Sequence, residues 1–437
     1  MRKKSGYRKT PHSSLLMTHF IALRYLLGRA HEGGRYLRGA AAGIALSLIP
    51  IMVTLIVADG MIRGITDRYL ELGTGHLQVF DYMDGELGPV SLEDAIPLIA
   101  EDENVRGVWP EQHSLGVLVG NHGKTGATIR AIDPAFWEDP GSGAYLVTVA
   151  GSSRLESDRE LLLGEALAES IGAEVGKTIR LMTVHLSEDG RSIPHLTPFT
   201  VRGIISSGYR ELDSLWCVMT YEAGKQVLPP ELSSSYLMVK IKNPYTKAED
   251  MALSLNFTLG AGFGVYTWKE LQRSQYSSYE STRQLLLFIM ALIVLVAAVN
   301  VSSATSMLVI ERQRDIAVLK AAGASPGDTG RIFLWGSFLT GLTGALLGIG
   351  VGLLIGNCIN PIIRGLEVIL GFFSRLFHGG DVKILDPGYY LETIPIVIDW
   401  SAVFLISLFT IFSSILASWI PAYRAGKIRP IEILRKY

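Results

Sequence analysis

Four stretches of the sequence contain no Asp, Glu, Lys or Arg over a length that can cross a lipid bilayer. They run from Gly39 to Ala58, from Leu285 to Ile310, from Ile332 to Ile363 and from Ser401 to Tyr423. A helix needs about 20 predominantly apolar residues to span the hydrocarbon core. Buried helices of a soluble protein are the alternative, but several runs of this length argue against it. The sequence therefore predicts four transmembrane helices.

Composition supports a membrane protein. Of the 437 residues, 48% are hydrophobic and 19% are charged, and the mean hydropathy is +0.30. Soluble domains usually carry about 25% charged residues. These values exclude a disordered protein, a coiled coil and a disulfide scaffold, and the formal net charge of −1 argues against nucleic acid as a partner. The third charge-free stretch exceeds one span, so we expect it to be tilted, broken near Pro361 or ended before Asn360.

Charge is segregated along the chain and predicts its orientation. Residues 1–38 carry nine basic side chains and one acidic one, and residues 424–437 carry five and one. Residues 59–283 instead carry 19 basic and 31 acidic side chains, and residues 364–399 carry three and five. Basic residues near membrane spans mark the cytoplasmic side. Both termini are therefore predicted to be cytoplasmic, with a large domain and a shorter loop outside.

The N-terminal segment has its own pattern. Four apolar residues share one helical face, with arginines nearby: Leu16, Phe20, Leu23 and Leu27. This pattern predicts an amphipathic helix on the cytoplasmic membrane surface, with a solvated basic leader as the alternative. A secretory signal peptide fits poorly, because the apolar run starts only at Gly39 and extends for a full span.

The predicted architecture is an integral membrane α-helical protein with four transmembrane helices and a large extracytoplasmic α+β domain between the first and second helices. The segments in chain order are a cytoplasmic N-terminal segment (1–38), transmembrane helix 1 (39–58), the extracytoplasmic domain (59–283), helix 2 (284–310), a cytoplasmic coupling segment (311–331), helix 3 (332–363), an extracytoplasmic loop (364–400), helix 4 (401–423) and a cytoplasmic tail (424–437).

Alternation of apolar residues predicts strands in the outer domain. The expected strands are 75–80, 127–132, 178–182, 199–204 and 236–241, and the expected helices are 92–100, 165–171, 221–226 and 247–255. Strands and helices mixed in one unit indicate an α+β domain, with two lobes as one arrangement of it.

A hairpin is predicted between Met182 and Thr200, with its turn at residues 188–190. Because it is expected to protrude from the domain, it is a candidate docking site for a partner, and an ordinary surface hairpin is the alternative. The candidate docking residues are Glu188, Asp189, Gly190, Arg191 and Pro194.

No residue pattern predicts covalent chemistry. The strings Gly176-Lys-Thr178 and Gly123-Lys-Thr125 lack the first glycine that a phosphate-binding loop requires five residues earlier. The histidines show no metal-ligand spacing, and His76 at a strand start is expected to be structural. Cys217 and Cys358 fall in different compartments, so no disulfide is expected. We predict no catalytic residue, no metal and no cofactor in this chain.

The stretch between the second and third charge-free segments is the most informative one. We expect helix 2 to continue past the membrane, to end at Gly323, and to be followed by a new helix opened by Ser325-Pro326. Such a helical connector can transmit force from a cytoplasmic partner, and a connector without a partner is the alternative. The candidate coupling residues are Glu311, Arg312, Arg314, Asp315, Lys320 and Gly323.

Glycines recur every four residues in the third stretch and share one helix face. Small residues at this spacing let helix backbones approach closely. The spacing does not distinguish contact within the subunit from contact with another subunit, although packing within the bundle is favoured. The residues are Gly344, Gly348, Gly352 and Gly356.

Several of these segments resemble a known superfamily, the FtsX/MacB-type permeases of mechanotransmitting ABC transporters. The resemblance is carried by the opening 22–29, the string Asn300–Ser325 and the C-terminal segments 417–424 and 429–435. In the outer domain, 75–78, 132–134, 163–168 and 208–213 also match in kind. The order of the parts is preserved along nearly the whole chain. Within the superfamily the chain is most similar to lipoprotein-releasing permeases of the LolC/LolE type.

The resemblance implies a transporter subunit that is not itself an enzyme. A separate cytoplasmic ATPase dimer would bind ATP and Mg and grip the coupling segments of two permease subunits, identical or homologous. The pair of permease subunits, which would contact membrane lipid, would lift an acylated lipoprotein out of the outer leaflet of the bacterial inner membrane. It would hand the lipoprotein to a soluble periplasmic chaperone, which in one family subunit docks on a hook at the position of the 182–200 hairpin. The hairpin sequence departs from that hook.

Two other functions stay open on the sequence. One is an efflux-type permease that exports peptides or drugs with an adaptor, although single-chain efflux relatives carry a fused ATPase domain that is not found here. The other is a signalling subunit that activates an outside hydrolase without transport. Relatives of that kind have outer domains smaller than the 59–283 segment.

Overall fold

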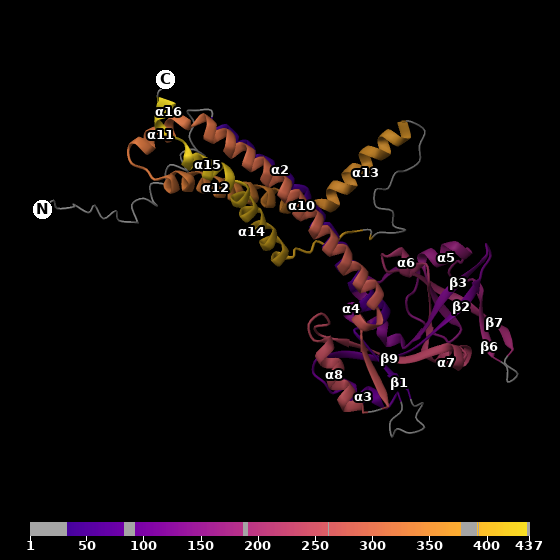
Figure 1. Cartoon of the computed structure of the whole chain (residues 1–437). Coiled ribbons are helices and arrows are strands. Elements are labelled where there is room, and N and C mark those ends of the chain that lie inside the picture. The colour runs from indigo at the N-terminus through magenta and orange to yellow at the C-terminus, as the bar shows by residue number, and fades with distance from the viewer. Residues whose placement is uncertain are drawn as a thin grey trace. The chain divides into compact units, whose positions relative to one another are not determined.

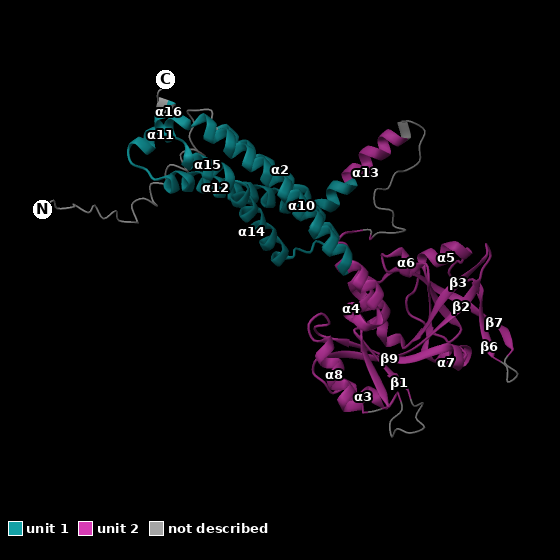
Figure 2. Cartoon of the chain, viewed as in Figure 1, with its two compact units in different colours: residues 1–60, 280–364, 396–437 teal, residues 61–279, 365–395 magenta. Residues whose placement is uncertain are grey.

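The structure is a computed structural model, and it describes residues 33–82, 92–186, 191–260, 262–376, 391 and 393–434. The predicted N-terminal amphipathic helix lies outside the described residues. The chain divides into two compact units (Figure 2): residues 1–60, 280–364 and 396–437 form unit 1, and residues 61–279 and 365–395 form unit 2.

Helices build unit 1 (Figure 1). Four of them are long and apolar enough to cross a membrane, as the sequence predicts. The long helices are α2 (Gly33–Arg68), α10 (Arg273–Glu311), α12 (Pro326–Asn357) and α14 (Trp400–Ala417), the last continued after Ser418 by α15 (Trp419–Lys427). Shorter helices are α11 (Gln313–Ala321) and α16 (Pro430–Leu434), and α13 (Ile359–Leu376) begins in unit 1 and continues into unit 2 (Figure 2).

The third apolar stretch is broken, in agreement with one of the expected outcomes. Helix α12 ends at Asn357 and α13 begins at Ile359, with Cys358 between them in a non-helical conformation. The helices also extend beyond the charge-free stretches, because charged and polar residues continue the helical pattern at their ends. Helix α2, for example, runs ten residues past Ala58.

The core of the helical unit is apolar and contains a few hydroxyl groups. Four helices share one cluster, which includes Ile44 and Leu48 of α2, Val294 of α10, Ala345 of α12 and Ile406 of α14. In a second layer, the hydroxyl of Thr305 lies 3.1 Å from that of Ser337 and 3.3 Å from that of Ser418. Each of the three is buried. These hydroxyl contacts tie three helices together in surroundings where unpaired polar groups are costly.

Unit 2 is built on one mixed β-sheet. Within the described residues its order is β10-β1-β9-β2-β3-β8-β5-β7-β4, with β6 paired to β2 and β7. The pairs β3·β8 and β5·β7 are parallel and the others are antiparallel. The strands are β1 (Leu77–Asp81), β2 (Val105–Val119), β3 (Lys124–Ile132), β4 (Val147–Gly151), β5 (Glu160–Gly164), β6 (Thr178–Leu186), β7 (Ser192–Ser206), β8 (Trp216–Thr220), β9 (Ser233–Ile241) and β10 (Phe263–Thr267).

Short helices cover the sheet and complete the α+β domain that the sequence predicts. They are η1 (Tyr69–Thr74), α3 (Ala95–Ala100), η2 (Pro134–Glu138), α4 (Pro140–Tyr145), α5 (Glu165–Ile171), α6 (Arg210–Asp213), α7 (Tyr221–Val227), η3 (Pro230–Leu232), α8 (Ala248–Leu259) and α9 (Trp268–Leu271). Two large apolar cores lie on the sheet. One contains Leu163 and Phe199, and the other contains Val79 and Leu255. The two lobes considered above thus share one sheet.

Candidate functional site

The coupling segment has the local structure that its sequence predicts, with one added break. Helix α10 ends at Glu311, and Arg312 leaves the helical conformation before α11 begins. Helix α11 is capped at Ala322, and Gly323 follows with a φ of +100°, a conformation that favours glycine. The Ser325 and Asp328 side chains then form a reciprocal capping box that opens α12.

One face of α11 is anchored in the helical unit. Ile316 and Ala317 are buried, and Ile316 packs in a cluster with Leu37 of α2, Phe333 of α12 and Ala425 of α15. Because this cluster draws on the five helices α2, α10, α11, α12 and α15, a shift of α11 would disturb the packing of the other four.

Lys320 fastens α11 to the C-terminal helices. Its ammonium group donates hydrogen bonds to the carbonyl oxygens of Gly426 at 2.8 Å and Ile428 at 2.7 Å. These carbonyls lie at the C-terminal end of α15, where a cation also complements the helix dipole. Lys320, one of the candidate coupling residues, thus holds the segment in place through its own side chain.

The opposite face of α11 is open. Arg314 and Asp315 are exposed there, as is Glu311 at the end of α10, and Asp315 accepts a hydrogen bond at 3.1 Å from the less exposed Arg312. Val318 lies among them with 53% of its surface exposed. The sequence reasoning missed Val318, although an apolar residue amid charges on an outward helix face is a signal of a contact surface.

A groove of about 720 Å³ lies along the start of α12 and along α15, and Lys320 is the residue of α11 in its lining. The lining combines aromatic and basic side chains, including Arg331 on one wall and Trp419, Tyr423 and Lys427 on the other. The groove enlarges the surface that a partner of the coupling segment can contact.

The glycine stripe of α12 packs against α2 within the same subunit. Each glycine faces one α2 residue, and a Cβ atom built on the glycine would overlap it. From a Cβ built on Gly344, the nearest α2 atom would be the Cβ of Ile44, at 2.8 Å. From a Cβ on Gly348 it would be the Cβ of Leu48, at 2.8 Å, and from a Cβ on Gly352 it would be the Cβ of Met52, at 2.6 Å. Gly356 faces Ile56 in the same way. The two helices therefore run parallel in close contact.

A charged clasp, consisting of Asp59, Arg283 and Asp399, joins three helices of unit 1. Arg283 of α10 donates to Asp59 of α2 at 3.0 Å and also to Asp399. Asp399 caps the start of α14 through the backbone amides of residues 401 and 402. The sequence analysis placed no carboxylate in a span, and the clasp lies just past the charge-free stretches. It fixes the ends of the three helices relative to one another.

A cluster of four charges lies in unit 2, where helix α2 gives way to η1. The residues of this four-charge cluster are Glu71 of η1, Arg106 of β2, Asp139 before α4 and Lys240 of β9. Arg106 donates to Glu71 and Asp139 at 2.7 Å each, and the Lys240 ammonium lies 2.9 Å from Asp139 and 3.2 Å from Glu71. Lys240 is fully buried.

Burial and pairing set the charge states of this cluster. Burial lowers the pKa of Lys240 below its ordinary value, and the neighbouring carboxylates only partly oppose this. Although burial alone would raise the pKa of Asp139, hydrogen bonds from Arg106 and Lys240 hold it below its ordinary value. Removal of one member would leave an uncompensated charge out of water.

A second ion pair holds the π-helical turn η1 directly. Arg130 of β3 is buried and contacts both carboxylate oxygens of Glu111 of β2, at 2.6 and 3.1 Å. The same guanidinium donates to the carbonyl oxygens of Leu72 and Gly73 in η1. His76 is structural, as expected, because its Nδ1 accepts a hydrogen bond from the Ile241 amide. The end of the α2 helix is thus bound to three strands of the sheet.

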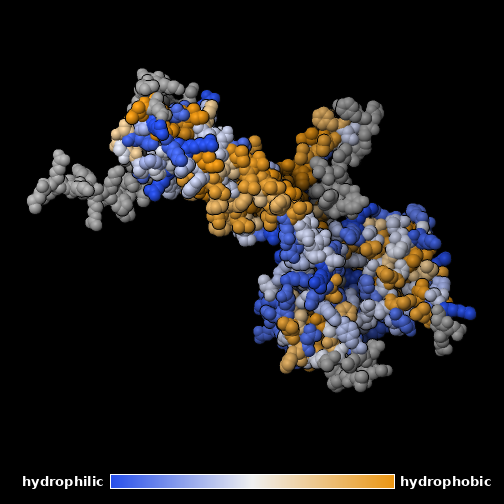
Figure 3. All heavy atoms as spheres, in the orientation of Figure 1, coloured by the Kyte–Doolittle hydropathy of each residue, from blue (hydrophilic) through white to orange (hydrophobic). Residues whose placement is uncertain are grey.

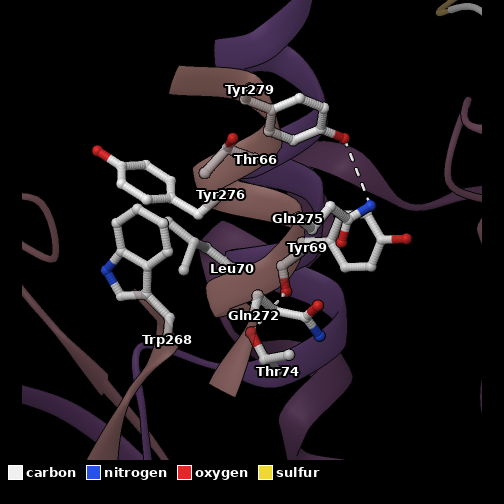
Figure 4. Close-up of a pocket in the computed structure, with 9 residues that line it drawn as sticks. All are labelled: Thr66, Tyr69, Leu70, Thr74, Trp268, Gln272, Gln275, Tyr276 and Tyr279. Atoms are coloured by element: carbon white, nitrogen blue, oxygen red, sulfur yellow. Dashed lines mark hydrogen bonds between the residues drawn. The ribbon is translucent and has the colours of Figure 1, made fainter. Parts of the chain in front are cut away.

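The seam between η1 and the start of α10 is packed rather than open (Figure 4). Aromatic and amide side chains from both segments meet there, among them Tyr69, Gln275 and Tyr279, and Gln275 donates to the Tyr279 hydroxyl. The cavity between them has about 20 Å³, which is room for a single water. This seam binds no ligand of useful size, and it joins the two helices where they enter the sheet unit.

The predicted hairpin is present as β6 and β7, paired from Thr178↔Thr200 to Leu186↔Ser192. Of its candidate docking residues, Glu188, Asp189 and Gly190 lie outside the described residues. Arg191 and Pro194 are exposed. The described part also exposes three apolar side chains that the sequence reasoning did not single out: Leu186, Ile193 and Leu196.

The described residues contain no group of three or more His, Cys, Asp or Glu side chains placed to hold a metal ion. Cys217 is buried, and burial raises the pKa of its thiol to about 12. The conspicuous charges of the site are thus structural pairs and an exposed helix face.

Comparisons with known proteins agree with this class. The family model of the MacB-like periplasmic core domain matches residues 39–252, and that of the FtsX-like permease C-terminal domain matches residues 287–430. The chain is 28% identical over 422 residues to the lipoprotein-releasing system transmembrane protein LolC of Xylella fastidiosa (strain 9a5c), covering 95% of this chain and 98% of the relative. It is 24% identical to the LolE protein of Haemophilus influenzae, covering 96% and 99%.

A solved structure of the periplasmic region of MacB from Actinobacillus actinomycetemcomitans also matches, with 17% identity and a TM-score of 0.31 over 48% of this chain and 95% of that one. The family models carry the assignment. The protein is a membrane subunit of the ABC transporter permease class. It belongs to the FtsX/MacB-type permease superfamily, and the curated relatives that match nearly its whole length are lipoprotein-releasing permeases.

Proposed function

We propose that this chain is the permease subunit of a lipoprotein-releasing ABC transporter in the bacterial inner membrane. In this proposal, unit 2 lies in the periplasm and both termini lie in the cytoplasm, which the segregation of basic residues supports. The subunit pairs with a second permease subunit, and a separate cytoplasmic ATPase dimer supplies ATP hydrolysis. The similarity to LolC and LolE over nearly the whole chain supports the proposal that the transported cargo is a lipoprotein.

The observation that carries the mechanism is the length of two helices. Helix α2 has 36 residues and α10 has 39, whereas about 20 residues cross the hydrocarbon core. About 16 to 19 residues of each helix, or roughly 25 Å at 1.5 Å per residue, therefore lie outside the hydrocarbon. Helix α10 ends at the coupling segment, and both helices contribute residues to unit 2. Such helices carry motion across the membrane without moving a solute through it.

The coupling segment receives the motion in this proposal. The ATPase contacts the open face of α11 around Arg314, Asp315 and Val318. Because Ile316 and Lys320 fix the other face of α11, a displacement of this helix passes into the helical unit. At the other end, the four-charge cluster and Arg130 pass the displacement from η1 to the sheet.

Energetics explain why the cargo needs an acceptor. Each acyl methylene that leaves the bilayer for water costs about 0.8 kcal/mol, so extraction requires both ATP and a new apolar surface. We propose that a soluble periplasmic chaperone supplies that surface and docks on the β6–β7 hairpin. The exposed Leu186, Ile193 and Leu196 give this hairpin an apolar contact area.

The distribution of lipoproteins between the inner and outer membranes tests the function. The protein is depleted in its native cell, and mature acylated lipoproteins are quantified in separated membranes. Accumulation in the inner membrane is the expected result, with restoration by the wild-type gene. An unchanged distribution would contradict the proposal and would direct attention to efflux substrates or to an outside hydrolase.

A further inference from the structure

Helix α13 is strongly amphipathic. Its described polar side chains are Asn360, Arg364, Glu367 and Ser374, and at about 100° per residue they fall on one narrow stripe together with Gly371. The apolar arc covers roughly two thirds of the circumference. A helix on a soluble core needs an apolar face of only about 100°.

The apolar arc of α13 is open to the surroundings (Figure 3). Val368 has 73% of its surface exposed and Phe372 has 67%, and Ile369 and Phe373 are also exposed. So many exposed apolar side chains in one element indicate contact with something apolar.

The connectivity places α13 at the surface of the membrane. It starts one residue after α12, a helix that can cross the bilayer. Its own charges at Arg364 and Glu367 interrupt the apolar run, and it is not among the four spanning candidates.

Helix α13 also has to remain on one side. The carbonyl of Pro326, at the start of α12, would lie 2.5 Å from a Cβ on Gly426, near the end of α15. Helix α12 and the α14–α15 segment therefore run antiparallel, and the segment between them leaves and re-enters the bilayer on the same side. A flat position in the interface satisfies both the connectivity and the wide apolar arc.

We propose that α13 lies in the bilayer interface, with its apolar arc among the acyl chains and its polar stripe at the lipid headgroups. With 18 residues it extends for about 27 Å along the membrane surface. It occupies the leaflet into which α12 emerges. The inference requires only that α12 crosses a bilayer, and it does not depend on the cargo proposed above.

Site-directed spin labelling of the full-length protein tests this position. Cys358 is exposed and is replaced by alanine, whereas Cys217 is left in place because it is buried and its raised pKa keeps it protonated. Single cysteines are introduced at Ile369 on the apolar arc and at Gly371 on the polar stripe. A Cβ at Gly371 meets no atom within 4 Å, so this control variant fits the helix.

The readout is the collision rate of each spin label with oxygen, which partitions into lipid, and with a water-soluble nickel chelate. The protein is held in phosphatidylethanolamine–phosphatidylglycerol nanodiscs. Leu347, exposed on α12, gives the lipid reference, and Phe257, 92% exposed on α8, gives the aqueous reference. We expect the label at 369 to match the lipid reference and the label at 371 to shift toward the aqueous one.

Two results would overturn the proposal. Aqueous accessibility at both 369 and 371 would show that α13 stands free of the bilayer. Protection of 369 from oxygen and chelate alike would show that a protein surface, such as a second copy of this chain, covers the apolar arc. Both results are independent of the lipoprotein distribution measured for the proposed function.

Discussion

The contact between α2 and α12 can be tested by a substitution that adds a single methyl group to α12. In the structure, a Cβ on Gly348 would lie 2.8 Å from the Cβ of Leu48 and 2.9 Å from the Cα and the carbonyl oxygen of Ala45. Carbon atoms in contact are ordinarily about 3.5–4.0 Å apart. Two of these three atoms belong to the backbone or its carbonyl, which cannot rotate away. Gly348→Ala therefore has to separate the two helices by about 1 Å.

The expected cost follows from this overlap. Forcing an extra carbon into a packed interface destabilises a protein by about 1–3 kcal/mol. Gly350 provides the matched control, because it lies on the same helix and no atom is within 4 Å of a Cβ there. Gly350→Ala is expected to be neutral, or stabilising by up to about 1 kcal/mol through helix propensity. The two variants should thus differ by about 1–4 kcal/mol.

Thermal unfolding in detergent, followed by the helical circular dichroism signal, measures the difference. We expect a lower midpoint for Gly348→Ala than for wild type, and an equal or higher midpoint for Gly350→Ala. Equal midpoints for the two variants would refute the reasoning, because the glycine stripe would then not be the contact between α2 and α12.

Three further predictions concern the coupling face and the four-charge cluster. Val318→Asp should weaken ATPase binding by about tenfold or more, equivalent to about 1.4 kcal/mol, in a pull-down titration, whereas Val318→Thr should bind nearly as wild type. Lys240→Met should destabilise unit 2 by about 3–5 kcal/mol, because Asp139 and Glu71 lose a buried cation, and limited proteolysis should detect it; unchanged resistance would contradict the cluster's role. The pKa of Asp139 is lowered in the folded state, so its contribution to stability is complete above its ordinary value of 3.8 and is lost as the pH falls through the folded-state pKa. Asp139→Asn should therefore be less stable than wild type at neutral pH and lose less stability on acidification, and parallel pH profiles for the two proteins would contradict this.

Much of the architecture could be predicted from the sequence, because membrane spans and capping residues act locally. The four long helices follow from charge-free stretches, and the end of the coupling segment at Gly323 and the start of α12 after Ser325 follow from helix-capping rules. The break at Arg312 was not predicted. The hairpin was predictable because apolar and polar residues alternate in the two strand sequences on either side of a turn. By contrast, the 15 residues of β2 contain one proline, two glycines and charges that hide the alternation expected of a strand.

The buried ion pairs of unit 2 were the main feature that we did not predict from the sequence. Arg130 and Lys240 stand in apolar strand sequences that the sequence analysis quoted only as strands. A charged side chain in such a string is costly unless a partner meets it, so its presence was a signal of a buried ion pair. The partners Glu111 and Asp139 could not be assigned, because the pairing depends on strand order and the sequence alone does not determine that order.

The central claim is that ATP-driven movement of the coupling segment releases an acylated protein from the membrane. The most direct measurement is release of a labelled acylated lipoprotein from proteoliposomes that contain this permease, its partner permease and the ATPase, with a soluble acceptor outside. The account predicts release that requires ATP, the acyl chains and the acceptor, and that falls with Val318→Asp but not with Val318→Thr. Release that is indifferent to acylation, or full release by the Val318→Asp variant, would contradict it.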